Sequence, residues 1–268
     1  MVTTMLSFAI AAACTQPDLD HRAWTRFLGR YVEGGLVDYA AVKGRGLADL
    51  EAYVSALDAI CPEAYAKLAP GDQLAFLLNA YNAHVVRLVA GAYPIASIRD
   101  VTEPFKRPIV PLRVLGASPM SLDALENELI RKRFGEPRVH FALVCAAMDC
   151  PPLRKEAYLG RKIEQQLEEQ ARLFVGDRRK NRFDADAKVL ELSAIFDWFH
   201  GDFEKAGSVP TFVAKYLGDG VAAPGVVVRF RDYDWTLNDA KRGRGPGPLE
   251  TSSSDGIEPA PSNRRGKP

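Results

Sequence analysis

The stretch that decides the fold runs from Asp72 to Ala90 and reads Asp-Gln-Leu-Ala-Phe-Leu-Leu-Asn-Ala-Tyr-Asn-Ala-His-Val-Val-Arg-Leu-Val-Ala. Its large apolar residues recur at intervals of three and four, which predicts a helix with a buried apolar stripe. Asp72 can cap the free N–H groups of the first turn, and Gly91 and Pro94 end the pattern. At 1.5 Å per residue this helix spans about 27 Å, enough to cross a domain.

Shorter patterns on both sides of this helix predict more helices than strands. The sequence therefore indicates an α+β fold, a helix-rich single domain with a small β-sheet. We expect helices over 20–31, 47–57, 121–134, 161–174, 193–203 and 209–217, and extended segments at 37–39, 141–144, 188–192 and 226–230.

The composition is that of an ordinary globular protein and excludes one class of partner. The chain has 268 residues, of which 47% are apolar and 26% charged. Lys and Arg number 35 against 34 Asp and Glu, a formal net charge of +1. Because nucleic-acid binding depends on a basic field, we expect no nucleic acid among the partners.

The two ends of the chain differ in composition from the part between them. Residues 1–20 read as a leader, because a short apolar run ends in Ala-Ala-Ala-Cys14, which resembles a lipoprotein cleavage box. This predicts export to the periplasm or a lipid-anchored place in the cell envelope, with Cys14 as the membrane tether. The absence of Lys or Arg before Arg22 favours the alternative, a frayed N-terminus of a cytosolic protein. Residues 21–239 form the predicted globular domain, and residues 240–268, rich in Gly, Pro, Ser and charge, are expected to be disordered.

The segment from His140 to Pro152 carries the residues best suited to chemistry. It reads His-Phe-Ala-Leu-Val-Cys-Ala-Ala-Met-Asp-Cys-Pro-Pro and holds two of the four cysteines and one of the four histidines. A buried strand is expected at 141–144, and the prolines after Cys150 favour an extended exit. In a regular strand His140 and Cys145 lie on opposite faces, whereas Cys150 can fold back toward either.

We consider three interpretations of these cysteines. As a nucleophile, Cys150 or Cys145 needs His140 as a base and Asn82 or Glu126 as an orienting group. As a disulfide, the pair closes a ring of about six residues and adds about 2 kcal/mol by loop entropy. In an oxidising compartment Cys61, Cys145 and Cys150 are an odd set, so one thiol stays unpaired or pairs elsewhere. A zinc site lacks a fourth ligand and the paired cysteine spacing, so we expect no metal and no cofactor.

The long helix contains two asparagines and a histidine where apolar residues are expected. Asn79 and Asn82 are three residues apart and can lean the same way, and each needs a hydrogen-bond partner if buried. They either tie down irregular backbone or orient an active site. We expect Asn79 and Tyr81 to contact a ligand, and His84 to be a surface or half-buried ring. Glu126 lies on the helix that Ser121 caps.

Several motifs in order resemble the domain-of-unknown-function 547 (DUF547) family over residues 22–238. The resemblance implies a mostly bacterial, often exported domain without a settled activity. It places the family's recurrent polar positions on Asn79, Asn82, Glu126, His140, Cys145 and Cys150. Many members carry histidine after the glutamate, where this chain has Asn127. The motifs are Val37-Asp38-Tyr39, Gln73 to Asn82, Ser121 to Glu126, Arg138 to Pro152, Ile195 to Trp198, and Tyr233 to Asn238.

Two functions compete on this evidence. The first is an exported thiol-dependent hydrolase or acyl transferase whose pocket is lined by the long-helix amides, Glu126, His140 and the cysteine corner. The second is a binding or scaffold module of the envelope without catalysis, in which Cys145–Cys150 is a disulfide and the polar helix face recognises a peptide or small-molecule ligand. The sequence does not name a substrate.

Overall fold

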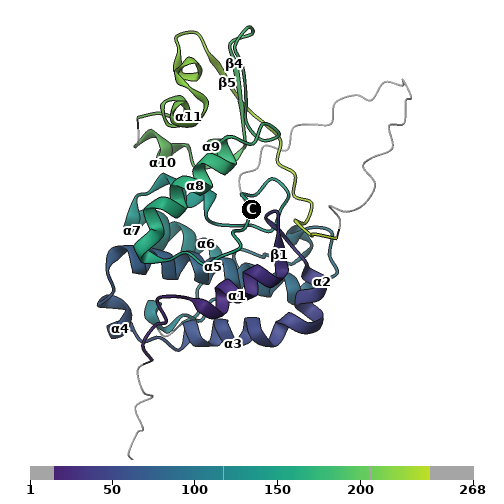
Figure 1. Ribbon diagram of the computed structural model, residues 1–268, viewed down its shortest axis with the longest axis vertical. Coiled ribbons are helices and arrows are strands. Elements are labelled where there is room, and N and C mark those ends of the chain that lie inside the picture. Colours follow the sequence, from purple (N-terminus) through teal and green to yellow (C-terminus); the bar gives the residue numbers. More distant parts are fainter. Residues whose placement is uncertain (1–14, 117, 206, 242–268) are drawn as a thin grey trace, which may run out of the picture.

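The computed structural model describes residues 15–116, 118–205 and 207–241. Figure 1 shows an elongated molecule, with α1 to α7 in a broad lower body and α9, α10, α11, β4 and β5 in the upper part. The helix α8 (Ile163–Val175) lies between the two and contacts both α5 and α11. The architecture confirms the helix-rich α+β fold.

The lower body is built around one long helix, α5 (Pro70–Ala92). The other α-helices of this body are α1 (Arg22–Tyr31), α2 (Tyr39–Ala41), α3 (Leu47–Asp58), α4 (Pro62–Ala66), α6 (Leu122–Ala124) and α7 (Lys132–Phe134). Two π-helical segments join neighbours, η1 (Val42–Gly46) and η4 (Leu125–Arg131), and 3-10 turns form η2 (Ile98–Asp100), η3 (Arg113–Leu115) and η5 (Pro137–Phe141).

The upper part combines short helices with a small sheet. Its helices are α9 (Ile195–Trp198), α10 (His200–Glu204) and α11 (Val209–Leu217), with 3-10 turns η6 (Gly160–Lys162) before α8 and η7 (Asp219–Ala222) after α11. The sheet has the order β3 (Arg182–Asp184), β4 (Val189–Leu192), β5 (Val227–Phe230), antiparallel then parallel. A separate two-stranded hairpin pairs β1 (Val32–Glu33) with β2 (Leu36–Val37).

Helix α5 is more deeply buried than the sequence predicts. Every residue from Gln73 to Val86 is buried, so the helix is enclosed on all sides and not along one stripe. His84, expected at the surface or half-buried, is 1% exposed, because α3 covers that face. The helix begins at Pro70, whose fixed φ suits a first turn, so Asp72 lies in that turn and does not cap it.

The strand predicted at 141–144 is wrong. The chain forms η5 up to Phe141 and then continues irregularly, with no strand assigned there. Instead of a neighbouring strand, the side chain of Asn82 pairs with this backbone: its Nδ2 donates to the Ala142 carbonyl and its Oδ1 accepts from the Val144 N–H, both at 2.9 Å. A side-chain amide has the donor and acceptor of a peptide group, so it replaces the missing ladder.

Other predicted elements agree with the structure within a few residues, with one further difference. Ser121 caps its helix as expected, since its Oγ accepts from the Ala124 N–H at 3.0 Å. The helix predicted at 193–203 breaks at Phe199 into α9 and α10. Within residues 15–116, 118–205 and 207–241, no helix has the length and apolar character needed to cross a bilayer.

The predicted leader and tail lie mostly outside the described residues. Of the leader, residues 1–14, including Cys14, are not described, whereas Thr15 forms a β-bridge with Ile60. Of the tail, residues 242–268 are not described, whereas the Ala240 N–H donates to the Val37 carbonyl at 3.0 Å. The last described segment runs back from β5 to the lower body beside β1 and α2 (Figure 1).

The Asn82 pairing predicts a large effect of mutation. Asn82→Ala leaves two buried backbone groups without partners, and we expect the free energy of unfolding to fall by about 2–4 kcal/mol. The control is Gln165→Ala, since Gln165 donates to Glu169 on the exposed face of α8, and we expect a change within about 0.5 kcal/mol. Urea denaturation of both variants measures this; equal small losses would show that the Asn82 amide does not hold the segment.

Candidate functional site

The two cysteines of the His140–Pro152 segment form a disulfide, Cys145–Cys150. Cys61 is also disulfide-bonded, and no cysteine of the described residues is free. The sequence left two options for the third cysteine, an unpaired thiol or pairing elsewhere. Within the described chain none of the three is unpaired, so pairing elsewhere is the option that holds for Cys61. Because neither Cys145 nor Cys150 is a thiol here, the nucleophile arrangement expected for a hydrolase or acyl transferase is not assembled.

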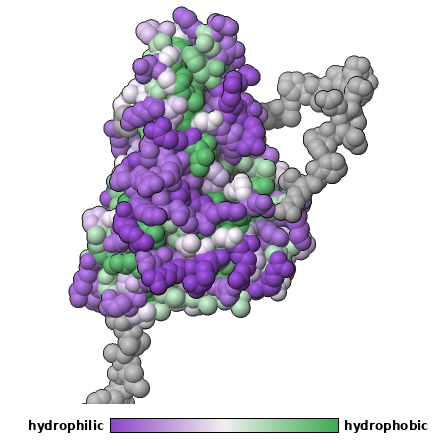
Figure 2. Space-filling model, viewed as in Figure 1, coloured by the Kyte–Doolittle hydropathy of each residue, from purple (hydrophilic) through white to green (hydrophobic). Residues whose placement is uncertain are grey.

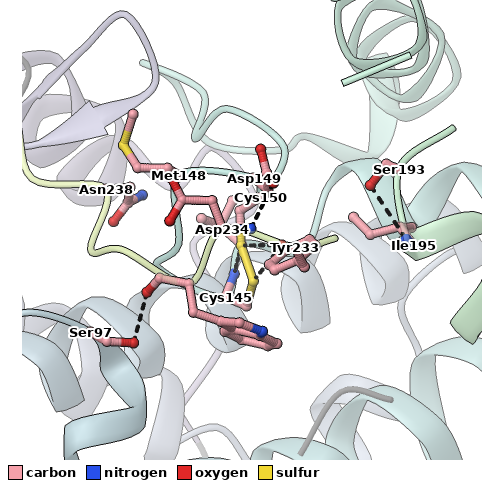
Figure 3. Close-up of a disulfide and its surroundings, with 12 residues drawn as sticks. Ser97, Cys145, Met148, Asp149, Cys150, Ser193, Ile195, Tyr233, Asp234 and Asn238 are labelled. Carbon is pink, nitrogen blue, oxygen red and sulfur yellow. Dashed lines mark hydrogen bonds between the residues drawn. A yellow bond between two sulfur atoms is a disulfide. The ribbon is translucent and has the colours of Figure 1, made fainter. Parts of the chain in front are cut away.

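The disulfide closes a short loop with hydrogen bonds to both sulfur atoms. The Cys145 N–H donates to the Cys150 Sγ at 2.8 Å, and the Tyr233 hydroxyl donates to the same sulfur at 3.2 Å. The Tyr233 hydroxyl also lies 3.1 Å from the Cys145 Sγ, and Figure 3 shows the ring beside the disulfide. Burial raises the pKa of Tyr233 well above 10, and the carboxylates of Asp149, Glu126 and Asp234 add to this, so the hydroxyl keeps its proton.

The segment after β5 lies along the disulfide loop and pairs with it. The Met148 N–H donates to the Thr236 carbonyl at 2.8 Å, and the Asn238 N–H donates to the Ala146 carbonyl at 3.1 Å. Ala146 has a φ of 61°, in the left-handed region that residues with a side chain rarely adopt. The loop conformation is thus fixed by this pairing as well as by the disulfide.

His140 contacts α10 and Phe199, and it makes no hydrogen bond with either sulfur atom within the described chain. Its Nε2 lies 2.9 Å from Asp202 Oδ2 on α10, and its ring stacks on Phe199 at 3.9 Å between centroids. The residue is 3% exposed, and within the described chain its Nδ1 has no hydrogen-bond partner. Burial lowers the pKa of His140, while the carboxylates of Asp202 and Glu126 oppose this. The predicted pairing of His140 with Cys145 or Cys150 is therefore not present.

Asp202 is the partner that sequence reasoning missed, and it joins a wider network. Arg131 Nε donates to Asp202 Oδ2 at 2.7 Å, and Arg131 also donates to Asn127 Oδ1. Hydrogen bonds from His140 and Arg131 hold the pKa of Asp202 well below its usual range. Asn127 thus takes part in the network that orients His140. Asp202 is 62 residues from His140 in the chain, and no spacing rule links them.

The other predicted site residues are buried and already bonded. Asn79 Nδ2 donates to the Tyr158 carbonyl at 2.8 Å and its Oδ1 accepts from the Tyr158 N–H at 2.9 Å. The Tyr81 hydroxyl donates to Glu126 Oε2 at 3.2 Å, and Glu126 is 2% exposed. Asn79 and Tyr81 are both 0% exposed, so neither faces solvent as a ligand contact would. The amide contacts match the interpretation in which the asparagines tie down irregular backbone.

A large groove lies against the disulfide loop. Its volume is about 1360 Å³, and it is lined by the β1–β2 turn at Gly34 and Gly35, by residues 147–156, and by α8 with the turn that follows it. Cys150 lines this groove, but Cys145, His140, Glu126, Asn79, Tyr81 and Asn82 do not. The single pocket predicted from the sequence is therefore two separate places, a buried polar cluster and an open groove.

Two cations of the groove wall bind other parts of it, Lys180 its backbone and Arg154 its carboxylates. Lys180 Nζ donates to the carbonyls of Met148 and Cys150, both at 2.6 Å, and burial lowers its pKa to about 8. Arg154 bridges Glu156 at 2.7 Å and Glu169 at 2.8 Å. Neither residue was predicted, because a lysine or arginine in a polar loop has no spacing signature. Among the described residues, no three His, Cys, Asp or Glu side chains are placed to hold a metal ion.

The hairpin turn meets the other wall of the groove at Gly35. Its φ of +83° is a conformation that glycine adopts readily and other residues rarely do. A Cβ at this position would lie 2.4 Å from Pro152 Cβ. The Gly35 carbonyl accepts from the Leu153 N–H at 3.3 Å. The Gly34-Gly35 turn therefore fixes the distance between the hairpin and the chain that leaves the disulfide.

Comparison with known proteins gives one match. The model of the family described as "Protein of unknown function, DUF547" matches residues 65–175, a range that includes α5, Glu126, His140 and both cysteines of the loop. This confirms the family resemblance within residues 65–175. No curated protein and no solved structure matches the chain.

The contact at Gly35 predicts a difference between neighbouring glycines. Gly35→Ala is expected to lower the free energy of unfolding by about 1–3 kcal/mol more than Gly34→Ala, because overpacking adds to the backbone strain. Gly34 has a φ of +57° and no atom within 4 Å of its would-be Cβ, so Gly34→Ala adds backbone strain without overpacking. Thermal and urea unfolding of the pair measure this, and equal losses would exclude the Pro152 contact as the cause.

The buried imidazole predicts a pH dependence of stability. The pKa of His140 is lowered in the folded state, so below about pH 6.5 the unfolded chain binds the proton more readily and stability falls as the pH falls. His21, whose pKa burial lowers to about 4, acts in the same direction. We therefore expect His140→Gln to flatten, without removing, the loss of stability between pH 7.5 and 5.

The control for this measurement is His200→Gln, because the His200 side chain is 50% exposed. Chemical denaturation across the pH range should give this variant the slope of the unchanged protein. If both variants change the slope equally, the buried ring is not its source.

Proposed function

We propose, from the premise that residues 65–175 belong to the DUF547 family of unknown function, that this chain is a binding domain of an exported protein and that its groove takes an extended peptide. The observation that carries the proposal is the groove itself, walled by the disulfide loop, the Gly34-Gly35 turn and α8.

The size of the groove supports a peptide over a small molecule. Small-molecule sites have volumes of about 300–1,000 Å³ and enclose most of their ligand. This groove, at about 1360 Å³, exceeds that range and is bounded by three separate segments of chain. An extended polypeptide can occupy an open groove of this volume without being enclosed.

The chemistry of the walls also fits a polypeptide. Arg154, Lys155 and Arg172 line the groove together with Glu156 and Glu169, so its lining carries both signs of charge. Leu173 adds an apolar side chain that is 59% exposed. A wall of mixed charge does not favour a polyanion. Figure 2 shows a face of the molecule that is mostly hydrophilic, with apolar residues in separate patches. A peptide offers both charges and apolar side chains in turn.

The disulfides support export. Disulfides persist in oxidising compartments such as the periplasm, and here Cys145, Cys150 and Cys61 are all disulfide-bonded. A lipid tether through Cys14 concerns a residue outside the described part of the chain. A hydrolase or acyl transferase would require a reduced cysteine and a reoriented His140, so the binding domain is the function that the geometry supports best.

The proposal predicts a groove-specific loss of binding. Random decapeptides are selected on the full oxidised chain, and the dissociation constant of a selected, labelled peptide is measured by fluorescence anisotropy. Leu173→Asp places a charge on the groove wall in place of an apolar contact, and we expect binding to weaken at least about tenfold.

The matched control is Leu19→Asp. Leu19 is 38% exposed and does not line the groove, so its variant should bind within about twofold of the unchanged chain. Equal affinity of Leu173→Asp, or a failure to select any peptide, would refute the groove as a peptide site.

A further inference from the structure

We infer that the Cys145–Cys150 disulfide exchanges with thiols of a peptide bound in the groove, so that the groove takes a cysteine-bearing peptide and oxidises its thiols. This inference rests on the proposed function, because it uses the groove as the place where the peptide lies. Its basis is the combination of a disulfide at the groove wall with donors aimed at both sulfur atoms.

Only one of the two cysteines lines the groove, and both residues are almost fully buried, Cys150 at 3% exposed and Cys145 at 7%. Cys150 lines the groove, whereas Cys145 does not. Thiol–disulfide exchange proceeds by attack of a thiolate on one sulfur while the other leaves as a thiolate. A thiolate arriving from the groove therefore attacks the Cys150 Sγ, and Cys145 is the leaving group.

Both thiolates that form in the reaction find hydrogen-bond donors already in place. The Cys145 Sγ lies 3.1 Å from the Tyr233 hydroxyl. The Cys150 Sγ has two donors, the Cys145 N–H at 2.8 Å and the same hydroxyl at 3.2 Å. Because burial keeps Tyr233 protonated, its hydroxyl remains able to donate. A hydrogen bond to an ionised acceptor is stronger than one to a neutral acceptor, so these donors favour the reduced form.

A positive charge next to the loop acts in the same direction. Lys180 Nζ donates to the carbonyls of Met148 and Cys150, two residues of the loop itself. Nearby cations lower thiol pKa values and stabilise thiolates. Asp149 and Asp234, which lie near Tyr233 and Lys180, oppose this effect in part.

The exchange balances over two steps. In the first, a peptide thiolate forms a bond to the Cys150 Sγ, the Cys145–Cys150 bond breaks, and Cys145 leaves as a thiolate. In the second, another thiolate of the peptide attacks the peptide sulfur of the mixed disulfide, and Cys150 leaves as a thiolate. Two peptide thiols become a disulfide, two electrons pass to the protein disulfide, and the thiols' protons go to the cysteine thiolates or to water.

The first test measures reduction of the native protein. The full oxidised chain is equilibrated with reduced and oxidised glutathione at pH 7.5, quenched with acid and alkylated, and thiols at Cys145 and Cys150 are counted by mass spectrometry. We expect reduction within minutes while the far-UV circular dichroism of the chain stays unchanged. Reduction only under conditions that unfold the chain would overturn the inference.

Two tyrosine variants test the role of the hydroxyl. Tyr233→Phe removes the donor and keeps the ring, and we expect the equilibrium constant for reduction by glutathione to fall about tenfold. Tyr216→Phe is the matched control, because its hydroxyl donates to Glu168 and touches neither sulfur, and it should behave as the unchanged chain. Equal constants for both variants would overturn the inference, and both variants keep the disulfide.

A pair of peptides separates this inference from the proposed function. A groove-selected decapeptide is made with two cysteines and, in parallel, with two serines. If the serine form binds and the cysteine form does not become oxidised, the groove function stands and the redox inference fails. If glutathione reduces the disulfide rapidly but the serine form does not bind, the sulfur chemistry stands and the peptide groove fails.

Discussion

The structure depends on two asparagine side chains of α5 that stand in for a neighbouring strand. Asn82 pairs with the backbone of residues 142–144, and Asn79 pairs with both backbone groups of Tyr158, each through donor and acceptor. These segments are buried without regular secondary structure, so their polar groups need partners from side chains. A fully enclosed helix that presents amides at three-residue spacing supplies them, and it thereby fixes the chain before and after the disulfide loop.

The disulfide loop is consequently held by contacts from several separate segments of the chain. Asn82 holds the chain that enters it, the segment with Thr236 and Asn238 pairs along its side, and Lys180 binds the carbonyls of Met148 and Cys150. Gly35 packs on Pro152, where the chain leaves. A loop constrained this way keeps its disulfide beside the Tyr233 hydroxyl and Cys150 in the groove wall. The position of the sulfur atoms is therefore set by contacts from parts of the chain that are far apart in sequence.

The sequence predicts what local patterns encode and fails where pairing is long-range. The helices around Trp24, Leu50, Leu74 and Phe212 follow from apolar periodicity, and the family resemblance follows from ordered motifs. The segment 141–144 has the composition of a buried strand, yet its partner is an amide 60 residues away, which no periodicity reveals. The sequence predicts a set of site residues, but it does not show which of them reach the groove: Cys150 lines it, whereas His140 does not.

The buried cluster has a role of its own that follows from where its members sit. His140 is at the end of η5, Arg131 at the end of η4, and Asp202 on α10, so the cluster joins two turns of the lower body to a helix of the upper part. Phe141, the next residue, packs among the phenylalanines of the upper core, whereas Val139 and Ala142 pack in the lower one. Both the charged network and the apolar side chains of this segment thus connect the lower body with the upper part. Burying an ion pair costs desolvation, which fixed geometry and added hydrogen bonds offset, and here Asp202 accepts from both Arg131 and His140 at the boundary between the two apolar clusters.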